Sequence, residues 1–338
     1  MQESSFLAAI RADPSDRLAR LAYADWLEER DDPRAELIRV EEEMRLIPVF
    51  ADRFWHLKPR RNELRAASSP EWLSAMSYGT VCEPVFRHGV PDGWKERWRL
   101  IREFVERWHR IPMPDVGGRP DEIREAETRL GRTLPPSVRE WVAFAHDVRQ
   151  EQDYHDVLGN VYQLQDVEGC AALSLLLQSG GIYRSAVWHR DLKADDPPVS
   201  GFWRLYAPTG NEPFVPHETP IEPSLTSFAL RYAMGNVKTI GGGFSTCEVR
   251  DAAILVSNLK VTYPVQAMLE DEQIFEKDNI CIRFSPAARG EMPHIIVEVF
   301  NPLPPEGIPQ FLWDLTRGSG SFHGMFDRAS VPTRHTCI

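Results

Sequence analysis

The chain has 338 residues, 42% of them hydrophobic, and a formal net charge of -11. This length favours two domains, or one large domain with an extension, and the apolar content suffices for a full core. The five cysteines are widely spread and form no Cys-x-x-Cys pair, which argues against a disulfide framework and a structural zinc site. No secretory signal or membrane span is recognisable, so the expected location is the cytoplasm.

The first part of the chain is predicted to be helical. Asp13, Pro14 and Asp16 are placed as a capping residue, a first-turn proline and a first-turn acid of one helix. The apolar residues that follow recur at helical spacing, and Glu41, Glu42 and Glu43 are expected on a solvated helix face. The apolar residues of these two predicted faces are Leu18, Ala22 and Trp26, then Leu37, Val40, Met44 and Ile47.

Residues 6–14, 21–30 and 32–39 resemble the repeat-companion domain found in planctomycete proteins, a likeness that covers about residues 5–76. In that family the stretch similar to residues 86–90 commonly precedes a repeat array. No leucine-rich or other periodic repeat follows it in this chain. The resemblance implies a lineage and carries no biochemical activity that could be transferred.

A helix with an apolar stripe is predicted after this region and is expected to pack two domains together. Residues 111–118 are rich in proline and glycine and are the predicted linker. The expected organisation is a helical domain at 1–80, a connecting helix and linker at 81–118, and an α+β domain with a C-terminal strand extension at 119–338. The stripe consists of Trp94, Trp98, Ile101, Phe104, Val105 and Trp108.

The segment 119–145 predicts two short helices joined at a fixed angle. Pro120 suits the first turn of a helix, and Gly131 can adopt the left-handed conformation that ends one. Leu134 and two prolines then impose an extended step before a second apolar helical face.

This helix pair resembles the opening of the SUKH superfamily, which includes fungal cell-wall-assembly regulators and bacterial immunity proteins. The likeness continues at 181–188, 195–199 and 223–231 and covers about residues 111–236. The resemblance implies helices packed on a largely antiparallel sheet, and it assigns a scaffold role to the motif residues Glu127, Leu130, Gly131, Leu134, Pro135 and Trp141.

The pattern changes to strands after the helix pair, which makes the predicted fold class α+β. Strands are predicted around 182–188 and 202–206, and a helix from Ser224 to a stop at Gly235. The last third is expected to extend the same sheet, with strands at 253–256, 280–284 and 295–300 and a short helix at 309–315.

No motif for a nucleophile, a zinc helix or a dinucleotide loop is found in the sequence. Asp153, His155 and Asp156 are the best candidate metal ligands, and they support an alternative hypothesis of a metal-dependent hydrolase. The preferred expectation is a protein that is not an enzyme and that needs no cofactor and no metal.

Charge is divided unequally along the chain. Residues 1–110 contain 19 basic and 20 acidic side chains, a net of -1, whereas residues 111–338 contain 20 and 30, a net of -10. An acidic domain is poorly suited to nucleic acid and suits a basic protein partner. Because many SUKH proteins are thought to neutralise toxins, the resemblance implies an immunity-type inhibitor of a nuclease or deaminase domain; a regulatory scaffold is the alternative. The expected contacts are Asp195, Asp196, Trp203, Tyr206, Glu212 and Glu218.

Overall fold

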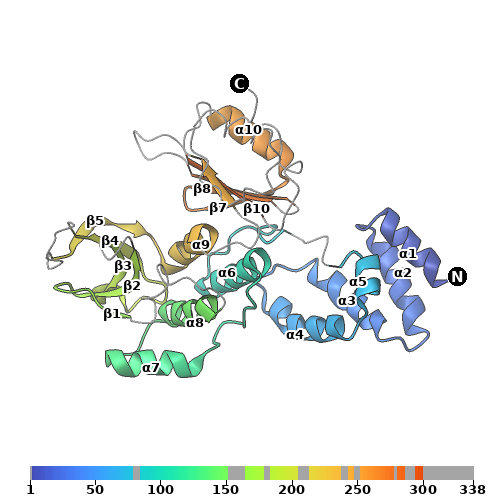
Figure 1. The fold of residues 1–338 in the computed structure, drawn as a ribbon, viewed down its shortest axis with the longest axis horizontal. Helices are drawn as coiled ribbons and strands as arrows, with labels where there is room; N and C mark the ends of the chain where they lie inside the picture. Colours follow the sequence, from blue (N-terminus) through green and yellow to red (C-terminus); the bar gives the residue numbers. More distant parts are fainter. Residues whose placement is uncertain are drawn as a thin grey trace, which may run out of the picture. The chain divides into compact units, whose positions relative to one another are not determined.

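The computed structural model describes residues 2–78, 84–150, 164–178, 183–204, 213–236, 243–246, 252–277, 280–285 and 294–299. The protein is α+β, with a helical N-terminal region and antiparallel sheets, as the sequence predicts (Figure 1). The chain divides into two compact units. Described residues of the first unit lie within Met1–Gly89 and Phe244–Val299, and those of the second lie within Val90–Gly243.

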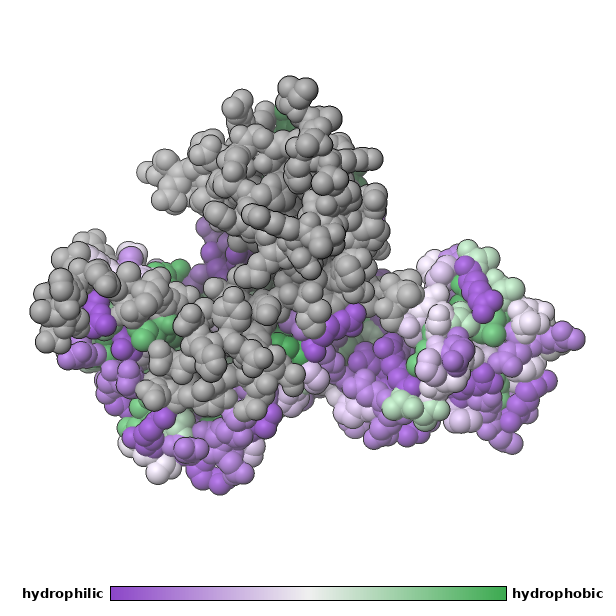
Figure 2. All heavy atoms as spheres, viewed as in Figure 1, coloured by the Kyte–Doolittle hydropathy of each residue, from purple (hydrophilic) through white to green (hydrophobic). Residues whose placement is uncertain are grey.

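The first unit begins with a group of consecutive helices. Their surface is mostly hydrophilic in the view of Figure 2, with small apolar areas between the polar side chains. The helices are α1 (Glu3–Ala12), α2 (Arg17–Glu28), α3 (Arg34–Met44), α4 (Asp52–Ala66) and α5 (Pro70–Ala75).

Helix α2 begins later than the sequence predicts, because Asp16 and not Asp13 is its N-cap. The side chain of Asp16 accepts hydrogen bonds from the backbone N–H groups of Leu18 (2.9 Å) and Ala19 (3.1 Å). Asp13 instead accepts a hydrogen bond from the N–H of Ser15. Pro14 has an acidic residue on each side of it in sequence. The later one, Asp16, accepts from the backbone N–H groups that the first turn of the helix leaves without partners.

The prediction of which α2 residues are buried is also wrong. Leu18 is 78% exposed and Ala22 is exposed, whereas Tyr23, Ala24 and Leu27 are buried. A step of four residues rotates around a helix by about 40° more than one full turn. Residues chosen at a constant spacing of four therefore move progressively away from the buried side of the helix.

The acidic run on α3 is buried in part, contrary to the prediction of a solvated face. Glu41 and Glu42 are 7% and 2% exposed, and only Glu43 stays half-buried. Glu41 forms an ion pair with Arg65, and Glu42 lies 3.6 Å from the fully buried Arg20. Burial raises the pKa of Glu42 above its ordinary value, which nearby arginines offset only in part. The leucine, valine and methionine of the predicted α3 face are buried as expected.

The described part of the second unit contains four helices and a five-stranded antiparallel sheet with strand order β1-β2-β3-β4-β5. A short 3-10 turn (His189–Asp191) follows β3. The helices are α6 (Trp94–His109), α7 (Pro120–Leu130), α8 (Pro136–Gln150) and α9 (Leu225–Asn236). The strands are β1 (Gln165–Asp166), β2 (Ala172–Gln178), β3 (Tyr183–Trp188), β4 (Val199–Trp203) and β5 (Val215–Glu222).

The tryptophan stripe of α6 lies mainly in the core, as predicted. Trp98 and Trp108 are almost fully buried, and α6 packs against α8 and α9. The indole of Trp98 donates a hydrogen bond to Ser137 Oγ (2.9 Å) and its ring lies against Phe144. Trp94, at the start of the helix, is only half-buried. These contacts all lie in the second unit, and a role of α6 in joining two domains stays a prediction.

The predicted linker at 111–118 is packed against the second unit. Met113 is 5% exposed, and Arg99 of α6 makes two hydrogen bonds of 2.8 Å to the carboxylate of Asp115. The N–H of Gly117 donates to Glu140 (2.7 Å). This proline- and glycine-rich segment is therefore a connection held in place by hydrogen bonds and burial, whereas its composition alone predicts a linker.

The C-terminal strands form a sheet of their own, which corrects the expectation that they extend the first one. The strand order is β6-β10-β9-β8-β7, and the described pairs in this order are antiparallel. The strands are β6 (Gly243–Thr246), β7 (Val265–Leu269), β8 (Glu272–Lys277), β9 (Ile280–Ser285) and β10 (His294–Val299).

A helix, α10 (Ala252–Thr262), replaces the strand predicted at 253–256. Leu255 and Leu259 are buried one turn apart, while Ile254 is 60% exposed. A short continuous apolar run has no period that separates a strand from a helix, which explains the error. The strands predicted at 280–284 and 295–300 correspond to β9 and β10, and the helix predicted at 309–315 lies outside the described residues.

Candidate functional site

The joint between α7 and α8 has the geometry that its glycine predicts. Gly131 follows the last residue of α7 with a φ of 62°, in the left-handed region. The N–H of Gly131 bonds to the carbonyl of Thr128, and the N–H of Arg132 bonds to that of Glu127, each at 3.2 Å. These two bonds satisfy carbonyl groups that the end of the helix leaves free.

Glu127 fixes the angle between the two helices. Its Oε1 atom accepts hydrogen bonds from the backbone N–H of Leu134 and from Nε of Arg139, each at 2.8 Å. One carboxylate therefore binds α7 to the extended step and to the first turns of α8. A charged acceptor with two donors gives a stronger bond than a neutral pair, so this acidic residue serves the fold.

The other motif residues lie in or beside the core. Leu134, Pro135 and Trp141 are buried, and Leu130 is half-buried. The indole of Trp141 donates to the carbonyl of Leu175 on β2 (3.3 Å), and its ring lies against the aromatic rings of α9. The contacts of the motif thus hold the helices on the sheet.

Asp196, an expected partner contact, has an internal role in the structure. Its Oδ1 accepts hydrogen bonds from Ser137 Oγ (2.9 Å) and from the N–H of Thr226 (3.0 Å). The neighbouring Asp195 has an exposed side chain, while its carbonyl accepts a hydrogen bond from the N–H of Ser137 (3.0 Å). This loop therefore ties the beginning of α8 to the beginning of α9, and only Asp195 offers a carboxylate to solvent.

Trp203 lies at an exposed position near the edge of the first sheet. It is 39% exposed, and its partner across the strands, Val215, is 44% exposed. β5 ends the strand order, so Val215 belongs to an edge strand. Ile221 on the same strand is 37% exposed. Large apolar side chains grouped at an exposed edge favour contact with another molecule.

Two further rings continue this surface on the same face. Tyr183 is opposite Trp203 in the strand register, and His217 follows Val215 by two residues. Their rings meet edge to face with centroids 5.9 Å apart, directly over Gly201, where a Cβ atom would lie 2.3 Å from the tyrosine hydroxyl. Burial raises the pKa of Tyr183, so the hydroxyl stays protonated at neutral pH. The sequence did not predict these two residues as a pair, because their approach depends on the register of β3, β4 and β5.

The predicted contact residues do not form one surface. Asp195 and Asp196 precede β4 and Trp203 ends it, so the two groups are separated by a strand about 16 Å long. Glu218 is part of β5, and Tyr206 and Glu212 lie outside the described residues. We call the group of Tyr183, Trp203, Val215 and His217 the edge surface.

The candidate metal ligands Asp153, His155 and Asp156 lie outside the described residues. Within the described ranges, no three His, Cys, Asp or Glu side chains lie close enough together to hold a metal ion. His189 makes a hydrogen bond to Asp166 (2.8 Å), which also pairs with Arg132. None of the helices in the described part of the chain has both the length and the hydrophobicity needed to span a bilayer.

Comparison with protein-family models, with curated proteins and with solved structures finds no match to this chain. Any assignment of function therefore depends on the chain's own residues and on the motif resemblance.

Proposed function

We propose that the chain is a non-catalytic protein-binding protein that contacts its partner through the edge surface. The proposal rests on the cross-strand pair of Trp203 and Val215, exposed by 39% and 44% where β5 ends the strand order of the first sheet. Tryptophan and tyrosine contribute disproportionately to binding energy in protein interfaces, because they bury a large area at a low cost in side-chain entropy.

The edge strand itself favours contact through side chains. Pro216 and Pro220 lie within β5 and have no backbone N–H to donate. Prolines on an edge strand hinder the addition of another strand, which is the usual route to uncontrolled pairing. A partner is therefore expected to cover the rings of the edge surface and not to extend the sheet.

Charge supports a basic partner. The net charge of -10 in residues 111–338 accelerates encounter with a positively charged surface and disfavours nucleic acid. The resemblance to SUKH proteins adds the biological role: inhibition of a toxin domain, such as a nuclease or deaminase, in the cytoplasm of the cell that makes this chain. The exposed carboxylate of Asp195 is a secondary contact in this proposal.

Co-expression tests the inhibitor role. The proposal predicts that a gene beside the one for this chain encodes a toxin domain, and that gene is expressed in a host, alone and together with the chain. The proposal predicts that the wild-type chain restores growth and that Trp203→Ala restores it less well at equal protein level. Lack of any toxin gene in the neighbourhood, or growth restored equally by both forms, would argue against inhibition through this surface.

A further inference from the structure

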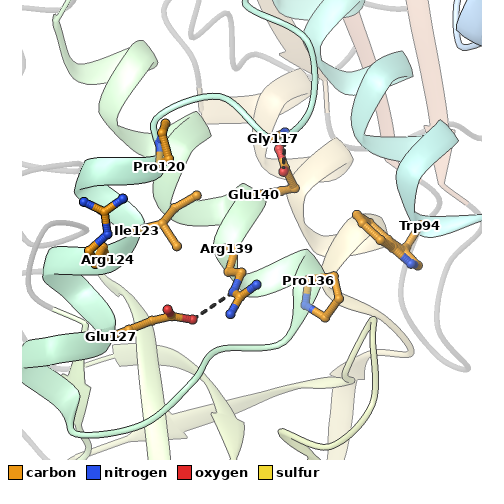
Figure 3. A pocket seen from close by; sticks show the side chains of 9 residues that line it. All are labelled: Trp94, Gly117, Pro120, Ile123, Arg124, Glu127, Pro136, Arg139 and Glu140. Carbon is orange, nitrogen blue, oxygen red and sulfur yellow. Dashed lines mark hydrogen bonds and ion pairs between the residues drawn. The ribbon is translucent and has the colours of Figure 1, made fainter.

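A cleft in the second unit has a volume of about 390 Å³ and lies away from the residues of the edge surface. Its walls come from the start of α6, from α7 and from the first turns of α8. Figure 3 shows Arg139 near the centre of the cleft, between Ile123 of α7 and Pro136 of α8. The volume falls within the range of roughly 300–1,000 Å³ that is usual for small-molecule sites.

Both carboxylates of the cleft are already bound by internal donors. Glu127 accepts from Leu134 and from Nε of Arg139. Glu140, which is 5% exposed, accepts from Gly117 (2.7 Å) and from Nη2 of the buried Arg102 (2.7 Å). Both oxygens of Glu140 are thus engaged in the scaffold, whereas Glu127 uses only Oε1 and pairs its charge with that of Arg139.

The free donors of the cleft are cationic. Among the described residues, the two terminal Nη atoms of Arg139 have no hydrogen-bond partner, because only its Nε binds Glu127. The hydrogen bond from Nε to Glu127 fixes the orientation of the guanidinium group. Its two Nη atoms are therefore already positioned to donate to a planar acceptor such as a carboxylate. Arg124 at the rim is 73% exposed and uses one Nη atom for Asp121. A guanidinium with two free parallel donors matches the geometry of a carboxylate.

The remaining walls are apolar. Half-buried Trp94 and Ile123 lie with two prolines around the cationic centre. Trp94 is the one tryptophan of the α6 stripe that is not buried. A cleft with apolar walls and a cationic group favours a ligand that has both an apolar body and a negative charge.

We propose that this cleft binds a small aromatic or aliphatic monocarboxylate. Arg139 receives the carboxylate through its Nη atoms, and Trp94 and Ile123 contact the apolar body. The site is independent of the proposed protein-binding function, because it uses neither β4 nor β5.

Isothermal titration of the full chain with 4-phenylbutyrate, and with its uncharged amide as the matched probe, tests the site. We expect the acid to bind at least tenfold more tightly than the amide. Arg139→Gln should weaken acid binding about tenfold and leave amide binding unchanged, since it removes a charge-assisted pair. Trp94→Leu should weaken both probes about fivefold, since it removes a shared apolar contact.

Arg190→Gln is the control, because its side chain is 75% exposed and does not line the cleft. This variant should bind both probes as the wild type does. Circular dichroism spectra that coincide with the wild type establish that Arg139→Gln and Trp94→Leu are folded. No binding of the acid at millimolar concentration, equal binding of acid and amide, or unchanged acid binding by folded Arg139→Gln would each overturn the proposal.

Discussion

The carboxylate of Asp196 accepts a hydrogen bond of 3.0 Å from the backbone N–H of Thr226, in the first turn of α9. The two residues are 30 positions apart in sequence, so a loop before β4 caps a helix that follows β5. The same carboxylate accepts a hydrogen bond from Oγ of Ser137 in α8. One acidic side chain therefore binds the first turn of α8 and the first turn of α9.

Replacing Asp196 by alanine should destabilise the second unit by about 1–3 kcal/mol, because a partly buried N–H and two hydroxyl groups lose a charged acceptor. Urea denaturation of the full chain measures the loss, and hydrogen exchange locates it at the start of α9. Asp195→Ala is the control and should change stability by less than about 0.5 kcal/mol, since its side chain is exposed. Equal losses in the two variants would contradict the capping role.

Gly131→Ala should destabilise the helix joint by about 1 kcal/mol. The glycine has a φ of 62°, and a Cβ atom added there would meet nothing within 4 Å. The cost is therefore conformational and not steric crowding. Gly131→Asn should cost less, because asparagine tolerates the left-handed region. Thermal unfolding of the three proteins checks this order, and an alanine variant as stable as the wild type would refute it.

The buried Glu42 gives a prediction about pH. Its pKa is raised by burial above the ordinary value of 4.5, so the folded state holds its proton more tightly than the unfolded state. Stability from this group is full at low pH and decreases as the pH rises from about 4.5 through the folded pKa. Glu42→Gln should match the wild type at low pH and become the more stable protein as the pH rises.

Glu43→Gln is the matched control for this pH series. A hydrogen bond from Arg53 lowers the pKa of Glu43, so its contribution to stability is present at neutral pH and is lost on acidification. The control should therefore be slightly less stable than the wild type at neutral pH, with a small effect because the side chain is 42% exposed. Parallel stability curves for wild type and Glu42→Gln would show that burial does not perturb Glu42.

Local signals predict much of this fold correctly. Pro120 and Gly131 bracket α7, and Ser224 caps α9 by accepting the N–H of Ser227 (3.1 Å), because caps and turns depend on neighbouring residues. Gly235 was expected to stop α9, but the helix continues to Asn236. The division into two sheets was not predictable, since strand pairing between distant segments leaves no periodic trace in a single sequence.

The candidate site was predicted only in part. Trp203 is exposed as expected, and it lies within the strand predicted at 202–206. Asp196 was expected on the surface, but its partner Thr226 is distant in sequence and no local pattern reveals the bond. The clustering of Tyr183 and His217 over Gly201 likewise depends on the register of three strands.

Titration calorimetry measures binding to the edge surface. The purified chain, as wild type, Trp203→Ala and Ile254→Ala, is titrated with the toxin domain that the proposal expects an adjacent gene to encode. Ile254 is the control because it is a large apolar residue, 60% exposed, on α10 of the first unit. Trp203→Ala should weaken binding about 30-fold or more, as for a hot-spot residue, and Ile254→Ala should have no effect. Binding of folded Trp203→Ala with wild-type affinity, or no binding by the wild-type chain, would contradict the proposal.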